Sequence, residues 1–238
     1  MKNEKCLEII KKNEQYTKKE IHYFPLVIKE CKGSIITDYD GKTYIDFLSS
    51  GSSLNLGSCH PVVTKAIKEQ LDRFSQYIFG YVQNWEAGEY ARLLTSVYPG
   101  GIKAKVAYTN SGSESIDTAI KYARVFTGRQ KIIYFINSYH GTTYGAISVS
   151  GHTIDMRNKM GPFLPEVYPF PFYGNNVSDE VAEKESTKSI EEAFQKYLPA
   201  DEVAAAFVEA VQGDAGILPT HTIFMKNYII YVKKMGYY

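Results

Sequence analysis

The sequence lacks the features that mark several large classes of protein. None of its apolar runs approaches the length needed to span a bilayer, and the opening residues, MKNEKCLEIIKKNEQYTKKE, lack the apolar core of a signal peptide. The 27 basic residues nearly balance the 26 acidic ones, so no excess charge indicates a polyanionic partner. We therefore expect binding neither to nucleic acid nor to a membrane.

Cysteine is also scarce. The three cysteines, Cys6, Cys31 and Cys59, are far apart and odd in number, and they form neither a metal-binding nor a redox spacing. Reduced, unpaired thiols are typical of proteins in reducing compartments. We expect a cytoplasmic protein that binds no metal.

Three widespread motifs are missing as well. The sequence contains neither the Gly-x-x-x-x-Gly-Lys loop of nucleoside triphosphatases nor the Gly-x-Gly-x-x-Gly fingerprint of dinucleotide-binding domains. Residues 112–116, Gly-Ser-Glu-Ser-Ile, lack the closing glycine of a nucleophile elbow, and the five histidines cannot be ordered into a triad. An unrelated hydrolase is consequently the weakest of the functional alternatives.

The composition that remains is that of an ordinary globular protein. In 238 residues, 44% are hydrophobic and 22% are charged, which is enough to bury a sizeable core. The first part has a charged helical stretch to about residue 20, short strands after Pro25 with a turn at Asp40-Gly41, and two helices, 61–74 and 86–97. The first of these helices carries one apolar face, formed by Val63, Ala66, Ile67, Leu71 and Phe74.

Strands and helices then alternate. We expect strands at 105–109, 131–136 and 203–208, a turn with a short helix at 139–150, and helices at 114–126, 178–197 and 222–235. Such alternation predicts an α/β fold with a mainly parallel sheet and flanking helices, preceded by a small α+β segment. Ligands of parallel sheets bind at the carboxyl ends of the strands.

A Ser-Gly-Ser junction lies at one of these strand ends. Ser111, Gly112 and Ser113 connect an expected strand to an expected helix, whose first turn presents unpaired N–H groups and the positive end of the helix dipole. Gly112 lets a bulky anion approach the backbone, and the hydroxyls can donate further hydrogen bonds. The junction is thus a candidate phosphate site. Taken alone, it is explained equally simply by a serine that caps the helix.

Two other strand ends carry suitable side chains. Tyr139 and His140 follow the expected strand 131–136, where an aromatic ring can stack on a planar ligand. Glu209 follows the apolar strand 203–208 directly, and a carboxylate there needs a polar partner or ligand. The three strand ends together favour a binding site over three unrelated turns.

At this point the sequence resembles the class-III aminotransferases, pyridoxal-phosphate enzymes of fold type I. Four stretches carry the resemblance, in the family's order: GKTYIDFLSSGSSLNLGSCHPVVTKAIKEQL, AYTNSGSESIDTAIKYAR, SYHGTTYGAISVSG and VEAVQGDAGILPT. One departure is Ala210, where the family usually has proline. The resemblance implies residues 1–60 as the N-terminal segment of the small domain and 61–238 as an incomplete large, cofactor-binding domain.

The resemblance also implies roles for individual residues. Ser111, Gly112 and Ser113 correspond to the loop that binds the phosphate of pyridoxal 5'-phosphate. Tyr139, with His140 beside it, corresponds to the aromatic residue stacked on the pyridine ring, and Glu209 to a glutamate that orders the active site. The stretch LSSGSSLNLGSCHP corresponds to the segment that lines the substrate entrance. Members of the family are homodimers that act on an amino donor and a 2-oxo acid.

Two parts of the family's machinery have no counterpart in the sequence. The family carries an aspartate, usually in an Asp-Glu-Val run, for the pyridine nitrogen, and a later lysine that forms the Schiff base. After Glu209 the sequence has no Asp-Glu-Val run, and its only lysines, Lys226, Lys233 and Lys234, fall on the expected terminal helix. We expect a chain truncated before these residues, with no catalytic residue of its own, weakened cofactor binding and no activity alone. The alternative is a non-catalytic or split-enzyme subunit that binds a phosphorylated cofactor and needs a partner chain.

Overall fold

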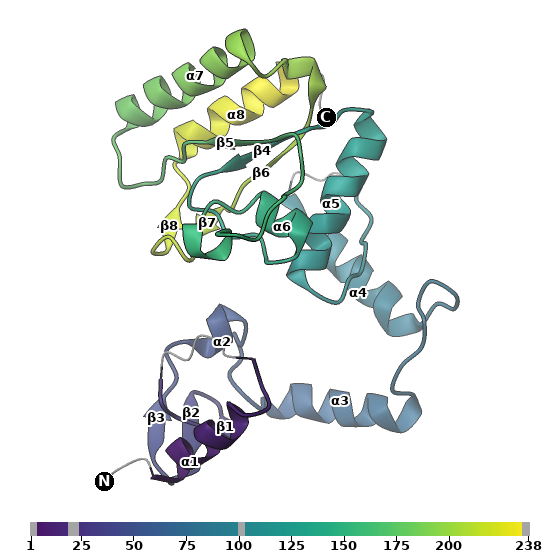
Figure 1. Cartoon of the computed structure of the whole chain (residues 1–238). Helices are drawn as coiled ribbons and strands as arrows, with labels where there is room; N and C mark the ends of the chain where they lie inside the picture. Colours follow the sequence, from purple (N-terminus) through teal and green to yellow (C-terminus); the bar gives the residue numbers. More distant parts are fainter. Residues whose placement is uncertain (1–3, 19–23, 100–102, 235–238) are drawn as a thin grey trace. The chain divides into compact units, whose positions relative to one another are not determined.

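The computed structural model describes residues 4–18, 24–99 and 103–234. They form two compact units, 1–97 and 98–238 (Figure 1). None of the helices in these described ranges is long and apolar enough to cross a membrane.

Unit 1–97 contains four helices and a small antiparallel sheet in its described residues. The elements are α1 (Glu4–Asn13), β1 (Ile28–Lys32), β2 (Ile35–Asp38), β3 (Thr43–Ile45), α2 (Ser49–Ser52), α3 (Pro61–Arg73) and α4 (Trp85–Ser96). The strands pair in the order β1-β2-β3, and Gly41, with a φ of 81°, forms the expected turn between β2 and β3. Helix α1 ends at Asn13, earlier than expected, and turns follow it. Residues 19 and 20 lie outside the described ranges.

Helices α3 and α4 begin where their sequence signals indicate. Pro61 occupies the first turn of α3, and the side chain of Asn84 caps α4 by accepting a hydrogen bond from Ala87 N at 2.8 Å. Neither helix contains a buried residue. No described residue of unit 1–97 therefore covers the apolar face expected on α3.

Unit 98–238 is built around a parallel sheet. Its larger elements are α5 (Gly112–Thr127), β4 (Lys131–Phe135), α6 (Tyr144–Ser148), β5 (Val167–Phe170), α7 (Asp179–Lys196), β6 (Val203–Phe207) and α8 (Thr222–Lys234). Two short 3-10 helices (Ile154–Met156 and Ala200–Glu202) and a hairpin of β7 (Val211–Gln212) with β8 (Leu218–Pro219) complete it. The three longer strands pair in the order β5-β4-β6, both pairs parallel, as the α/β prediction requires.

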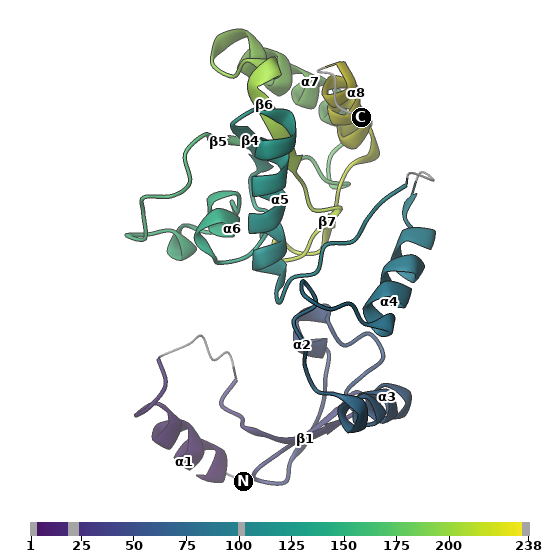
Figure 2. The same ribbon diagram turned by 90° about the vertical axis from the view of Figure 1, so that its right-hand side faces the viewer.

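Side chains of β4 alternate between two cores, as the pleat of a strand dictates. Ile133 and Phe135 pack with residues of α7 and α8, including Phe224 and Tyr228. Ile132 and Tyr134 pack on the opposite face, against the side of α5 that carries Ile120. Helices α7 and α8 thus cover one face of the sheet and α5 the other (Figure 1 and Figure 2).

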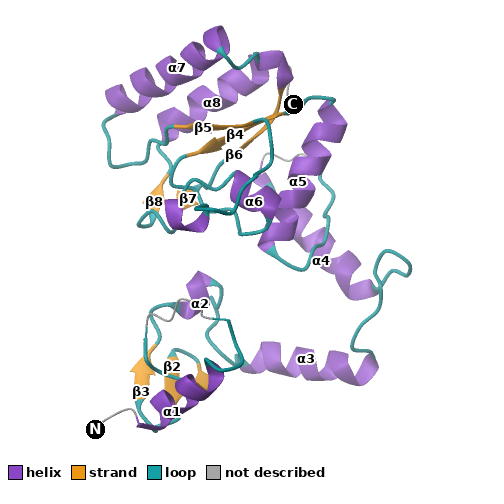
Figure 3. Ribbon diagram, viewed as in Figure 1, coloured by secondary structure: helices purple, strands orange, loops and turns teal. Residues whose placement is uncertain are grey.

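Two expectations for this unit are wrong in detail. Residues 105–109 form no strand, because they pair with no strand of the described sheet, and the connection into α5 is drawn as loop in Figure 3. Strand β5 was not expected, since Pro169 interrupts its pattern. Proline is tolerated there because β5 is an edge strand of the described sheet.

Candidate functional site

The Ser-Gly-Ser junction is the start of α5. Ser111 is the extended N-cap residue, and its Oγ accepts a hydrogen bond from Glu114 N at 3.2 Å. The carboxylate of Glu114 accepts in turn from Asn110 N at 2.6 Å. This arrangement resembles a capping box, so the simple capping explanation holds for the side chain of Ser111.

The first turn of α5 has backbone N–H groups that are available to a ligand. No described residue accepts a hydrogen bond from the N–H of Gly112 or of Ser113, as is usual for the first residues of a helix. The space beside Gly112 is open, since a side-chain carbon added there would meet no atom within 4 Å. Two free N–H groups at the positive end of a 16-residue helix can bind a phosphate.

The loop after β4 comes close to this turn. Thr142 N donates to Ser113 Oγ at 3.2 Å. Gly141 makes the approach possible: its φ is 129°, and an added side-chain carbon would lie 2.9 Å from Ser113 Cα. The glycine of the Tyr-His-Gly stretch therefore brings the loop after β4 to the start of α5.

The loop after β6 is hydrogen-bonded to the loop after β4. Tyr139 N donates to Glu209 Oε1 at 2.5 Å, and Gly213 N donates to Glu209 Oε2 at 3.2 Å. Both carboxylate oxygens of Glu209 are thus occupied by backbone donors, which suits an ordering role. The side chain of Tyr139 is 38% exposed, so its ring is accessible to a ligand.

His140 is directed into the protein. Its ring packs edge to face against Phe207, with centroids 5.9 Å apart, and its buried Nε2 has no hydrogen-bond partner in the described chain. Burial lowers the pKa of His140, and the nearby Glu209 carboxylate opposes that shift. The imidazole is consequently neutral at pH 7 and contributes packing beside Tyr139.

Two residues of the site were missed from the sequence. Thr142 supplies the backbone donor to Ser113, and Gln212 donates from its fully buried side chain to Ile136 O at 2.9 Å. The amide in a two-residue strand carries no periodic signal, so only the three-dimensional fold reveals its burial. Together, three loops can hold a phosphate monoester that carries a planar ring: the loop that leads into the first turn of α5, the loop after β4 and the loop after β6.

The segment that resembles a substrate entrance lies in unit 1–97. Four consecutive residues, 49–52, have left-handed backbone angles, with φ between 49° and 66°. A polar pocket of about 460 Å³ adjoins them, lined by Ser34, Asp46 and Asn55 among others. Left-handed conformations of non-glycine residues cost free energy and are concentrated at functional sites.

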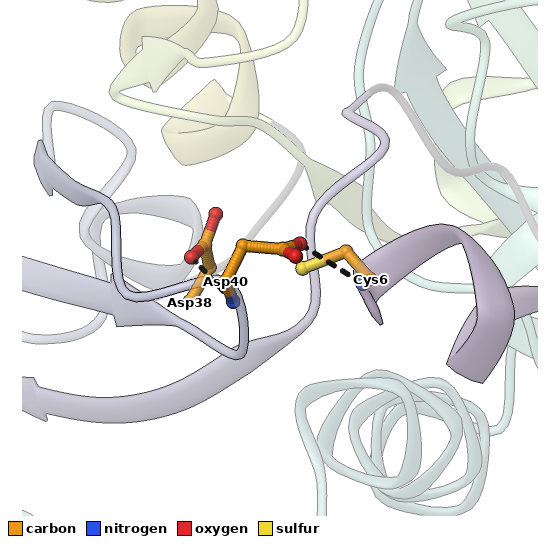
Figure 4. A group of neighbouring side chains, drawn as sticks. All are labelled: Cys6, Asp38 and Asp40. Carbon is orange, nitrogen blue, oxygen red and sulfur yellow. Dashed lines mark hydrogen bonds between the residues drawn. The ribbon is translucent and has the colours of Figure 1, made fainter. Parts of the chain in front are cut away.

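Unit 1–97 also contains a group of potential metal ligands, Cys6, Asp38 and Asp40 (Figure 4). Asp40 accepts hydrogen bonds from the N–H groups of Lys5 and Cys6, both at 3.0 Å, and so caps α1 from the β2–β3 turn. The carboxylate of Asp38 accepts hydrogen bonds from Asp40 N at 2.9 Å, Lys42 N at 2.8 Å and Tyr44 Oη at 2.9 Å. Hydrogen bonds from the thiol and backbone of Cys6 lower the pKa of Asp40. These bonds support a structural role for the group.

Among the described side chains of unit 98–238, which extend to residue 230, no lysine makes a hydrogen bond to the start of α5 or to the loops after β4 and β6. Lys131 lies at the opposite end of β4, where it pairs with Glu166 at 2.6 Å and Glu202 at 3.3 Å. Lys226 lies on α8, the helix that packs beside α7.

Fold and site together define an α/β domain in which the first turn of α5 and the loops after β4 and β6 are joined by hydrogen bonds. The sequence model of the family "Aminotransferase class-III" matches residues 16–236. The chain belongs to the class-III aminotransferase family.

Individual relatives agree with this membership. The chain is 36% identical over 232 residues to an isoleucine 2-epimerase of Lentilactobacillus buchneri, covering 94% of this chain and 52% of the relative. It is 36% identical over 217 residues to an alanine/serine racemase of Pyrococcus horikoshii, covering 87% and 46%. Among solved structures, a taurine:2-oxoglutarate aminotransferase of Bifidobacterium kashiwanohense, in complex with PLP and glutamate, matches with a TM-score of 0.85 and 29% identity, covering 100% of this chain and 55% of that one. The chain therefore spans about half the length of these relatives.

Proposed function

We propose that this chain holds pyridoxal 5'-phosphate and that the whole protein transfers an amino group from an amino acid or amine to a 2-oxo acid. The observation that carries the proposal is the hydrogen-bonded junction of three loops, through Ser113–Thr142 and Tyr139–Glu209. Membership of the class-III family supports the same cofactor.

Each residue of the junction has a separate task in this proposal. The free N–H groups of Gly112 and Ser113 bind the phosphate, and Ser111 keeps the helix start in place for them. The exposed ring of Tyr139 covers one face of the pyridine ring, while Glu209 fixes the backbone that carries it. His140 fills the space behind Tyr139 as a neutral side chain. When bound, the cofactor supplies an electron sink for the α-carbon of the substrate.

Two substitutions at Gly112 test the phosphate site. Gly112→Pro removes one N–H donor without disturbing α5, because proline is favoured at the first helical position and Ser111 is already extended. Gly112→Ala keeps the donor and meets no neighbouring atom within 4 Å. We expect phosphorus NMR titration to show at least about tenfold weaker pyridoxal phosphate binding for the proline variant, which loses a charge-assisted hydrogen bond. Equal binding by both variants would contradict the proposed phosphate site.

Amino-acid racemisation is a second candidate reaction. Its support is that an isoleucine 2-epimerase and an alanine/serine racemase are each 36% identical to this chain. Racemisation conserves the total amino acid and needs no 2-oxo acid, whereas transamination consumes both substrates. Chiral chromatography of isoleucine and alanine, with and without 2-oxoglutarate, separates the reactions. Inversion at the α-carbon without an oxo acid, seen as D-alanine from L-alanine or as the 2-epimer of isoleucine, would assign the racemase activity.

We further propose that a polypeptide of these 238 residues, without a partner chain, catalyses neither transamination nor racemisation. Among the described side chains of unit 98–238, which extend to residue 230, no lysine is hydrogen-bonded to the site, and such a lysine is needed as nucleophile and base. Borohydride reduction in the presence of pyridoxal phosphate, followed by peptide mass spectrometry, should label no single lysine. Specific labelling together with turnover would overturn this proposal.

A split enzyme is the alternative arrangement, in which a partner chain supplies the missing aspartate and lysine. Activity that appears only when such a chain is added would support it. For the whole protein we also propose the homodimer of the family, a cytoplasmic location, and a division at residue 60 between small and large domains.

A further inference from the structure

Gln212 is a buried polar residue in the hairpin after β6. Its side chain has 0% exposure and is among the largest fully buried side chains of the described protein. It lies on β7, a strand of two residues paired with β8. A buried amide costs free energy unless its donors and acceptors are satisfied, so its presence needs a reason.

The side chain makes one directed contact. Gln212 Nε2 donates to Ile136 O at 2.9 Å, whereas its buried Oε1 has no partner among the described residues. A methionine would fill a similar volume without leaving an acceptor unsatisfied. Filling the core therefore does not explain a glutamine at this position, and the contact with Ile136 does.

The hydrogen bond between Gln212 and Ile136 is one of two side-chain hydrogen bonds that join the segment after β6 to the loop after β4. Ile136 follows β4 and precedes Tyr139, and Gln212 follows Glu209 in the loop after β6. Glu209 holds the backbone N–H of Tyr139, and Gln212 holds the carbonyl of Ile136. A single hydrogen bond fixes a distance, but two bonds at different points of a loop also restrict its rotation.

The backbone between the two contacts is stiff enough to transmit this restraint. Asn137 has a φ of 68°, and its N–H donates to Gly151 O at 3.0 Å. Ser138 is fully buried, and its N–H donates to Phe135 O at 3.2 Å. A change at Ile136 O is therefore expected to reorient Tyr139.

We propose that Gln212 is a positioning residue that sets the orientation of Tyr139, and hence of the ring that covers the cofactor. This inference rests on the proposed function for its ligand, but the two-point contact between the loops exists without any ligand.

A double-mutant cycle tests the inference. Gln212→Met removes the contact and keeps the volume, Tyr139→Ala removes the ring, and Gln195→Met on the exposed side of α7 controls for the added thioether. We expect Gln212→Met and Tyr139→Ala each to weaken pyridoxal phosphate binding about 3- to 10-fold, as loss of ring stacking does. The double variant should bind no more weakly than Tyr139→Ala, and inorganic phosphate should bind all variants alike.

A ligand-free measurement separates this inference from the proposed function. Amide exchange followed by NMR should show faster exchange of the Tyr139 N–H in Gln212→Met, and an unchanged rate in Gln195→Met. Three results would each overturn the positioning role. They are an unchanged exchange rate of the Tyr139 N–H, additive effects of the two substitutions on pyridoxal phosphate binding, and equal losses of affinity for pyridoxal phosphate and inorganic phosphate. If the unsubstituted protein binds no pyridoxal phosphate, the proposed function fails and the role toward the cofactor fails with it, although faster exchange would still show the contact between the loops.

Discussion

Ser111 combines the requirements of a helix cap with those of a phosphate site. Its Oγ satisfies Glu114 N, so Ser111→Ala should lower the free energy of unfolding by about 1 kcal/mol. Ser111→Asp should preserve stability, because aspartate caps helices as well as serine, but its charge would lie beside the bound phosphate. We expect urea unfolding close to that of the unsubstituted protein and at least about tenfold weaker pyridoxal phosphate binding for the aspartate variant. Unweakened binding would place the phosphate elsewhere.

Glu166 gives the protein a pH-dependent contribution to stability at the other end of the sheet. Hydrogen bonds from Lys131 and Tyr168, at 2.6 and 2.8 Å, lower the pKa of its carboxyl group. A carboxyl group whose pKa is lower in the folded state stabilises the fold above its unfolded-state pKa of about 4.3, and this stabilisation is lost as the pH falls through the folded-state value.

Glu166→Gln should therefore lower the melting temperature at pH 7. The difference from the unsubstituted protein should shrink as the pH falls below about 4.3 and vanish below the lowered folded-state pKa. Thermal unfolding between pH 3 and pH 7 measures it. Glu183→Gln, at an exposed position on α7, is the matched control. A difference that persists at the lowest pH would indicate a packing effect instead.

At the scale of elements, β4 contributes most to the core. Phe135 is 2% exposed, and its ring packs edge to face against Phe224 and Tyr228 at 5.2 and 4.8 Å. Phe135→Ala should cost about 3–5 kcal/mol of unfolding free energy, because it removes a buried ring and leaves a cavity. Phe126 on α5 is 93% exposed, so Phe126→Ala should change stability by less than about 0.5 kcal/mol. Similar losses for both variants in urea unfolding would contradict the assignment of the core.

Elements whose signals are local could be predicted from the sequence. Helix α5 begins at a serine cap and ends at Gly128, which is left-handed, and β4 and β6 are apolar runs covered on both faces. Non-local features could not be predicted. Residues 105–109 have strand composition but pair with no strand of the described sheet, and β5 contains a proline that only an edge position permits.

The same distinction applies to the candidate site. The structure brings Ser113, in the first turn of α5, to the loop after β4, and it joins Tyr139 in that loop to Glu209 after β6. Tyr139 and Glu209 follow strands of one parallel sheet, as expected, whereas the residues before Ser111 form no strand of the described sheet. Their assignment to the cofactor stays a prediction. Gln212 and Thr142 could not be found from the sequence, because their contribution depends on a buried amide and on a backbone N–H.

At the scale of the whole molecule, the apolar face of α3 predicts self-association, because no described residue of unit 1–97 covers it. Val63, Ile67 and Leu71 recur at helical spacing along α3 and are 43%, 56% and 57% exposed. Exposed apolar stripes of this kind mark protein interfaces, and a twofold dimer is the most common assembly that covers them.

We expect sedimentation velocity to show a concentration-dependent dimer. Ile67→Glu combined with Leu71→Glu should give a folded monomer, because α3 contains no buried residue whose packing the charges would disrupt. Lys68→Glu, on the same helix but outside the stripe, should leave the dimer intact. A monomer at all concentrations, or a dimer that survives both glutamates, would show that this stripe does not bind a second copy.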